Sequence, residues 1–191
     1  MKQKNKKKRH VKSNKYKWKW ITAVFFLSFV ITVALSALST SINISGGRGF
    51  LLAGIVLMSF IVIGVVFDII ALAIATADEK PFHSMAAHGV KSAKYAIKLI
   101  RNAERITNFF SDVIGDIAGI VSGSTGIAIA AGLFLSSDRE EHVVIAGLIL
   151  TGLIAAMTVG GKAFGKSIAI NHNTKIVNAV SKIMYFFSRK R

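Results

Sequence analysis

Four long apolar runs, separated by basic segments, constrain this chain more than any other feature. The runs cover residues 20–42, 50–76, 109–135 and 143–159. A helix needs about 20 mostly apolar residues to cross a bilayer, so the second run is long enough to tilt and the fourth is only just long enough. We therefore predict an all-α membrane protein with four transmembrane helices. The alternative is a soluble bundle whose apolar helices bury one another.

The distribution of basic residues predicts how these helices are oriented. The chain is 52% hydrophobic, yet it has a formal net charge of +16. Nearly all of its 25 Lys and Arg residues lie before the first run, between the second and third runs, or after the fourth, and each of the two other connections has a single one. Basic connections remain on the cytoplasmic side of a membrane. We expect a multi-pass protein of the cell membrane with both termini cytoplasmic.

The N-terminal part is expected to comprise two segments. Residues 1–19 form a polybasic cytoplasmic tail, and residues 20–42 form an additional transmembrane helix. This apolar run is too long for a signal peptide and lacks a clear cleavage site. Trp18 and Trp20 are expected at the depth of the lipid headgroups, where the neighbouring lysines bind anionic lipid. We favour this interpretation over nucleic-acid binding.

Two further segments have the pattern of amphipathic helices that lie beside a membrane. In residues 81–106, Pro81 suits a first helical turn, Gly89 can break the helix, and basic residues then recur three or four apart, next to an apolar stripe. Residues 164–188 repeat this arrangement. A helix with one apolar and one basic flank lies in the membrane interface. We predict that the two juxtamembrane segments form a cytoplasmic collar, although simple anchoring is the alternative.

Acidic residues occur inside the second and third runs, where charge is costly. Asp68 lies in the second run, and Asp112 and Asp116 lie near the start of the third. At about 1.5 Å rise per residue, Asp68 and Asp116 are at similar depth. Carboxylate oxygens are ligands that Mg²⁺ prefers. Our candidate metal residues are therefore Asp68, Asp116 and Asp112, together with Gly115, whose backbone carbonyl is accessible to a cation where a helix breaks. The alternatives are a protonated Asp, an Asp paired with an interfacial Lys and, for Asp112, a simple place at the interface.

Small residues follow one face of the third run. Gly115, Gly119 and Gly123 are spaced i, i+4 and i+8, which allows helices to approach closely in lipid. We predict that this ridge supports helix packing and a homodimer. A second use is open, because glycine leaves backbone carbonyls accessible to a cation where a helix breaks.

The stretch "GGKAFGKS", residues 160–167, fits the spacing of a nucleotide-binding phosphate loop. Such a loop follows a buried strand and begins a helix, whereas this stretch follows a predicted membrane helix. The sequence has no cysteine, and its five histidines show no metal-ligating pair. We expect neither an enzyme nor a resident cofactor.

The stretch "FDIIALAIATADEKPFHSMAAHGVKSAKYAIKLIRNAERITNFFSDVIGDIAGIVSG" resembles the membrane domain of the CorB/CorC/CNNM family of divalent-cation transporters. In that family a cytoplasmic hairpin of the form A-x-x-G-x-x-x-A-x-x-A-x-x-L leads to N-x-x-R and a helix that opens Ile-Gly-Asn. The corresponding residues here are Ala86, Gly89, Ala93, Ala96, Leu99, Asn102, Arg105, Ile114, Gly115 and Asp116. The resemblance covers residues 50–191. It implies transport of Mg²⁺, with Co²⁺ as a second ion.

Several residues depart from the family pattern. Asp68 stands where the family has a serine at its cation site, and Asp116 stands where it has an asparagine. Lys162 replaces a glutamate and Gly165 replaces a proline. The first helix is an addition, and the family's nucleotide-binding CBS pair has no counterpart. The resemblance thus leaves two interpretations, a small divalent-cation transporter and a non-transporting scaffold or regulatory subunit that retains the fold.

Overall fold

A computed structural model describes residues 18, 21–38, 47–134 and 140–189. In this part of the chain every regular element is helical, and four helices are long and apolar enough to cross a membrane. They are Ile21–Leu38, Arg48–Thr76, Ala103–Gly132 and Val144–Asn171. The prediction of an all-α chain with four helices of membrane length is therefore confirmed. The predicted polybasic tail, residues 1–19, lies outside the described residues except for Trp18.

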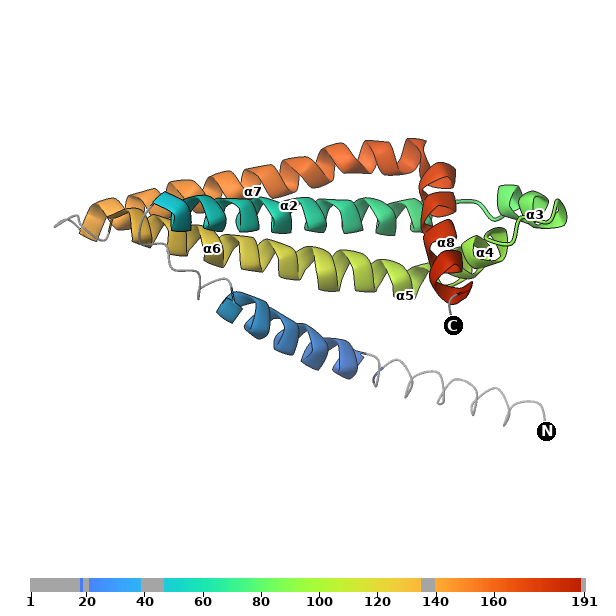
Figure 1. The fold of residues 1–191 in the computed structure, drawn as a ribbon, viewed down its shortest axis with the longest axis horizontal. Coiled ribbons are helices and arrows are strands. Elements are labelled where there is room, and N and C mark those ends of the chain that lie inside the picture. The colour runs from blue at the N-terminus through green and yellow to red at the C-terminus, as the bar shows by residue number, and fades with distance from the viewer. Residues whose placement is uncertain (1–17, 19–20, 39–46, 135–139, 190–191) are drawn as a thin grey trace, which may run out of the picture.

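Three long helices form a bundle: α2 (Gly47–Thr76), α6 (Asp116–Phe134) and α7 (Glu140–Asn171) run side by side along most of the molecule (Figure 1). Their apolar residues cover the whole helix circumference rather than one stripe, as is typical of helices that face both lipid and protein. In the half far from α8 they share a buried apolar cluster. Its members are Ala53, Leu57, Ile61, Ile129 and Ile154.

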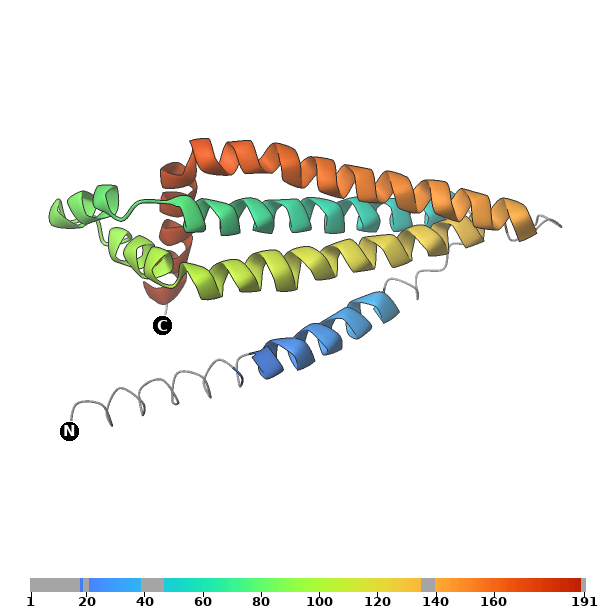
Figure 2. The same cartoon turned by 180° about the vertical axis from the view of Figure 1, so that it is seen from behind.

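The N-terminal helix Ile21–Leu38 lies obliquely beside this bundle (Figure 2). None of its 18 residues is buried, whereas 56% of an apolar 18-residue stretch of the third candidate span is. It contacts the bundle through three partly buried side chains, Val24, Ile31 and Leu35. The additional helix is therefore peripheral to the packed core.

The third long helix is not uniform along its length. It begins as the short α5 (Ala103–Thr107), continues as the π-helix η1 (Asn108–Gly115), and becomes α-helical again in α6. The return to α-helix coincides with a close approach to α2, because a Cβ added at Gly64 would lie 3.4 Å from the Gly115 carbonyl oxygen. Glycine at both positions lets the two backbones meet.

Helix α7 continues without interruption to Asn171, so residues 160–167 are helical throughout. The last helix, α8 (Asn173–Arg189), consequently begins later than the predicted residue 164. The physical reason is packing, since a Cβ at Gly165 would lie 2.6 Å from the Ile69 side chain of α2. Glycine here fits α7 closely against α2 and does not end the helix.

Three helices form a layer across the end of the bundle, which we call the end layer: α3 (Lys80–Ala87), α4 (Ala93–Arg101) and α8 (Figure 1). Helix α8 runs crosswise to the three long helices. The predicted segment 81–106 is divided among α3, α4 and α5, with Pro81 in the first turn of α3 and Gly89 at φ 83° after it. The layer is held by a shared cluster of buried residues. They are Ala73, Ile74, Phe82, Ala96, Leu99, Ala169 and Val177.

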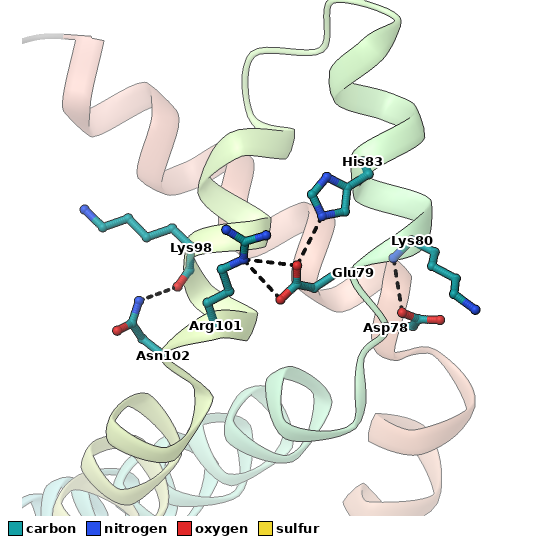
Figure 3. Close-up of polar contacts among 7 residues, drawn as sticks. All are labelled: Asp78, Glu79, Lys80, His83, Lys98, Arg101 and Asn102. Carbon is teal, nitrogen blue, oxygen red and sulfur yellow. Dashed lines mark hydrogen bonds and ion pairs between the residues drawn. The ribbon is translucent and has the colours of Figure 1, made fainter. Parts of the chain in front are cut away.

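Polar contacts connect the end layer to itself and to α2. Glu79 accepts hydrogen bonds from Arg101 Nε of α4 and lies 3.1 Å from His83 Nε2 (Figure 3). The bond to His83, together with the Arg101 guanidinium, lowers the pKa of the half-buried Glu79 carboxyl from its ordinary value. Asn173 of α8 donates to the Thr76 carbonyl oxygen at the end of α2, 3.0 Å away, and so satisfies a terminal backbone acceptor.

Candidate functional site

A polar pocket opens in the half of the bundle next to the end layer. It has a volume of about 460 Å³ and is lined by α2, the α5–η1 segment and α7. Its polar lining residues are Asp68, Thr107, Asn108, Ser111, Asp112, Lys162 and Lys166. Charged and hydrogen-bonding groups inside helices of membrane length are costly unless they serve one another or a ligand. The pocket is therefore the strongest candidate site in the part of the chain that the structure describes.

Asp68 and the π-helix define one wall of the pocket. The Ser111 hydroxyl donates a hydrogen bond of 2.5 Å to Asp68 Oδ1, joining η1 to α2. This bond orients the half-buried carboxylate and leaves its second oxygen for another partner. π-helical turns inside α-helices occur frequently at functional sites.

Asp112 lines the same pocket as Asp68. Its side chain is exposed, and the charges of Asp116, Asp68 and Lys162 all act on it. The sequence offered two interpretations for Asp112, a metal ligand and a residue of the interface. The structure brings it to the pocket, where two carboxylates from different helices line one space.

Asp116 has a different environment from Asp68. Its Oδ1 lies 3.4 Å from Lys162 Nζ of α7, and its side chain is 66% exposed while that of Lys162 is 22% exposed. Asp116 does not line the pocket directly, but Lys162 does. In the structure Asp68 and Asp116 make two separate contacts, one with Ser111 and one with Lys162. An Asp paired with an interfacial Lys is one of the alternatives that the sequence leaves open.

The glycine ridge serves more than one purpose. Gly115 is buried against Gly64, which indicates a packing role at this position. At Gly119 and Gly123, no described atom outside the neighbouring backbone of α6 itself lies within 4 Å of an added Cβ. These two glycines are therefore free of close contacts within the described chain, and the predicted homodimer stays a prediction.

Four pocket residues escaped the sequence reasoning: Thr107, Asn108, Ser111 and Lys166. The first three lie on the same α5–η1 segment as Asp112 and line the pocket together with it. A polar stripe leading into an apolar run was the available signal. Lys162 appeared in the sequence only as a departure from a family pattern, and its contact with Asp116 depends on how α7 packs.

Among the described residues, no group of three or more His, Cys, Asp or Glu side chains is arranged to hold a metal ion. A cation in the pocket would therefore be bound by few protein ligands, namely Asp68, Asp112 and the hydroxyl and amide oxygens beside them. Mg²⁺ commonly binds in this way, with one or two carboxylates and several retained waters. The residues present fit a partly hydrated divalent cation.

No family model matches the chain, and no curated protein or solved structure is significantly similar to it. The resemblance to the CorB/CorC/CNNM family thus stays a prediction from the motifs quoted above.

Proposed function

We propose that this protein is a multi-pass membrane transporter of divalent cations, with Mg²⁺ as its main ion and Co²⁺ as a second, of the CorB/CorC/CNNM type. The observation that carries the proposal is the pocket in which Asp68 and Asp112 come together within helices of membrane length. Carboxylates at such positions usually serve an ion pathway, because their desolvation is otherwise uncompensated. Ser111 and Asn108 add neutral oxygen ligands.

The proposal includes an orientation in the cell membrane. The end layer would be a cytoplasmic collar, with both termini cytoplasmic, because α4 and α8 and the segments beside them carry most of the basic residues of the described chain. Helix α8 runs crosswise to the bundle, and its exposed Phe186 and Phe187 would enter the inner interface beside anionic headgroups (Figure 1). A reporter fused to the C-terminus should be cytoplasmic, and an external C-terminus would overturn this orientation.

A homodimer is also part of the proposal. Gly119 and Gly123 leave α6 without close contacts along one face, which suits packing against a second copy. Replacing both glycines by Leu should weaken a detergent-stable dimer. An unchanged dimer would exclude this face as the interface.

The central test combines cation binding with transport. Purified wild-type protein should show Mg²⁺-dependent thermal stabilisation in detergent and Mg²⁺ flux in liposomes. Asp68→Asn keeps the size and one acceptor oxygen of the side chain while removing its charge, so it should weaken both readouts. Asp112→Asn should do the same. Asp78→Asn is the matched control, because Asp78 lies outside the pocket and only accepts a bond from the Lys80 backbone N–H.

A double substitution tests whether the residues share one ion. Asp68→Asn combined with Asp112→Asn should lose less than the sum of the single losses, because both residues would contact the same cation. Asp116→Asn should weaken binding less than Asp68→Asn, since the Asp116 carboxylate does not line the pocket itself and Lys162 competes with the cation for it. Full additivity would indicate separate sites.

A second candidate function is a non-transporting scaffold or regulatory subunit. The Lys162–Asp116 ion pair favours it, because a positive charge already occupies one carboxylate. A scaffold would show neither stabilisation nor flux at millimolar Mg²⁺, and its Asn variants would behave like wild type. That result would replace the transporter proposal.

A further inference from the structure

We propose that Lys162 is a tethered competitor for the transported cation, which occupies the carboxylate of Asp116 when the pocket is empty and yields it when a divalent cation enters. This inference rests on the proposed function and deepens it, because it assigns a role in ion release to a residue of the same pocket. The Lys162 ammonium carries the kind of charge that the carboxylates attract, on a flexible stem that can move.

The position of the ammonium group supports this role. Lys162 lines the pocket together with Asp68 and Asp112, yet its Nζ reaches out of it to Asp116 on the neighbouring helix. The group is lodged where α7 meets the junction of η1 and α6, since Nζ would lie 3.5 Å from a Cβ added at Gly115. A Cβ at position 115 would be in ordinary van der Waals contact with the ammonium, so a side chain longer than that of Ala would compete with it for this place. The absence of a side chain there makes room for the ammonium.

The strength of the contact also fits a reversible partner. The 3.4 Å separation is long for a charge-assisted hydrogen bond, which is typically about 2.7–2.9 Å. Asp116 is 66% exposed, so water screens the pair and competes for both charges. A structural ion pair would be shorter and more deeply buried. Breaking the contact between Lys162 and Asp116 therefore costs little free energy when a divalent cation arrives.

The charge relations around the pocket show why a competitor is useful. The Asp112 carboxylate is acted on by Asp68, Asp116 and Lys162 together. A divalent cation held by these carboxylates alone would leave slowly. When the Lys162 ammonium returns to Asp116, that carboxylate no longer attracts the bound cation, and the cation is released more easily. A transporter needs release as much as binding.

The test measures Mg²⁺ binding and transport by the full-length protein, with MgCl₂ as the only added ligand. Lys162→Met removes the competitor, so the dissociation constant for Mg²⁺ should fall by roughly fivefold or more, within the range typical of coupled binding events. In liposomes the KM should fall while the maximal rate also falls, because release becomes slower. Lys162→Arg keeps the charge and should restore behaviour close to wild type.

Two further variants separate competition from a general effect of charge. Lys166→Met removes the same charge from the same pocket, but no described carboxylate forms an ion pair with Lys166, so its effect should be clearly smaller. In an Asp116→Asn background, Lys162→Met should give little additional tightening, because the contested carboxylate is gone. Lys162→Gln is measured in parallel, so that a folding failure of one variant still leaves a result.

The outcomes distinguish the inference from the function on which it rests. If wild type binds Mg²⁺ but Lys162→Met and Lys162→Gln bind it equally or less tightly, Lys162 is only structural and the inference fails alone. Equal tightening by Lys162→Met and Lys166→Met would also overturn it. If neither wild type nor any variant binds or transports Mg²⁺, the proposed function and the inference fail together.

Discussion

The two halves of the α2, α6 and α7 bundle are packed by different means. In the half far from α8, apolar side chains from all three helices interlock in one buried cluster that includes Leu57, Ile129 and Ile154. In the half next to the end layer, the same helices enclose a pocket with carboxylate, ammonium and hydroxyl groups. Gly64 and Gly115 bring the backbones together between these regions. The apolar half is held together by packing, and the polar half gathers the charged groups.

This difference indicates how a single bundle combines stable packing in one half with a charged pocket in the other. In the proposed membrane setting, the lipid around the bundle is as apolar as the buried cluster, so packing in the far half would depend on shape and dispersion more than on removal from water. In the polar half, each charge depends on a partner from another helix, as Asp68 depends on Ser111. Substitutions in the far half should therefore change stability alone, and those in the polar half should change the response to cations.

The largest effect is expected at the boundary between the halves. Gly64→Leu would force a side chain against Ala118 Cβ, 3.1 Å from the first added atom, and against the Gly115 backbone, which cannot move aside. We expect a loss of about 3 kcal/mol of unfolding free energy, because overpacking separates the helices. Thermal unfolding in detergent measures it. Gly54→Leu on the same helix is the matched control, because no described atom outside the neighbouring backbone of α2 lies within 4 Å of a Cβ added there. An equal loss in this variant would contradict the boundary assignment.

The apolar half should respond strongly to a cavity. Ile154 is 4% exposed within the far cluster, so Ile154→Ala should cost about 2 kcal/mol, through lost contacts around the empty space. Ile149 lies on the same helix and is 68% exposed. Ile149→Ala should therefore change the unfolding free energy far less. If the two variants are equally unstable, the far half is not a specifically packed cluster. Mg²⁺ should stabilise both variants as it does wild type.

The polar half should respond differently when the pocket loses its hydroxyl. Ser111→Ala removes the donor to Asp68, a bond to a charged group that contributes about 1.5 kcal/mol in ordinary contexts. We expect a modest loss of stability and a larger loss of Mg²⁺-dependent stabilisation. Ser59→Ala is the control, because the exposed Ser59 hydroxyl bonds only to the Ile55 carbonyl of its own helix. A normal Mg²⁺ response in Ser111→Ala would remove Ser111 from the site.

The smallest effect is expected in the end layer, outside the bundle. The pKa of Glu79 is lowered in the folded protein, so its bonds to His83 and Arg101 stabilise the fold above the ordinary pKa of the carboxyl, 4.5. This contribution is lost as pH falls through the lowered value. Glu79→Gln should unfold at a slightly lower temperature than wild type at pH 7 and at the same temperature in strong acid.

A matched variant provides the control for this pH dependence. Glu104→Gln removes the same charge from α5, where the described residues form no ion pair with it. It should show no pH-dependent difference from wild type. A difference for Glu79→Gln that persists below the lowered pKa would show that packing, and not the ion pair, is responsible.

The sequence by itself determined the helical class and the approximate extent of the long helices. Apolar runs of membrane length are expected to be helical, because a helix forms the hydrogen bonds of all its interior backbone N–H and C=O groups within itself. The sequence also predicted the helix start at Pro81 and the helix end at Gly89. Proline fixes φ at a helical value, and glycine adopts the positive φ that other residues avoid. The sequence did not predict where α8 starts, because a glycine such as Gly165 suits close packing between helices as well as the end of a helix.

The tertiary structure alone decided which polar groups meet. The depth of Asp68 and Asp116 followed from helix rise, but depth does not fix rotation, and rotation assigned Ser111 to Asp68 and Lys162 to Asp116. The π-helix rotates the side chains of η1 away from the directions that a regular α-helix would give them. The 3.6-residue periodicity of an α-helix therefore does not predict that Asp112 lines the pocket. Local patterns specify which residues a helix presents, whereas the contact between helices specifies which of them become partners.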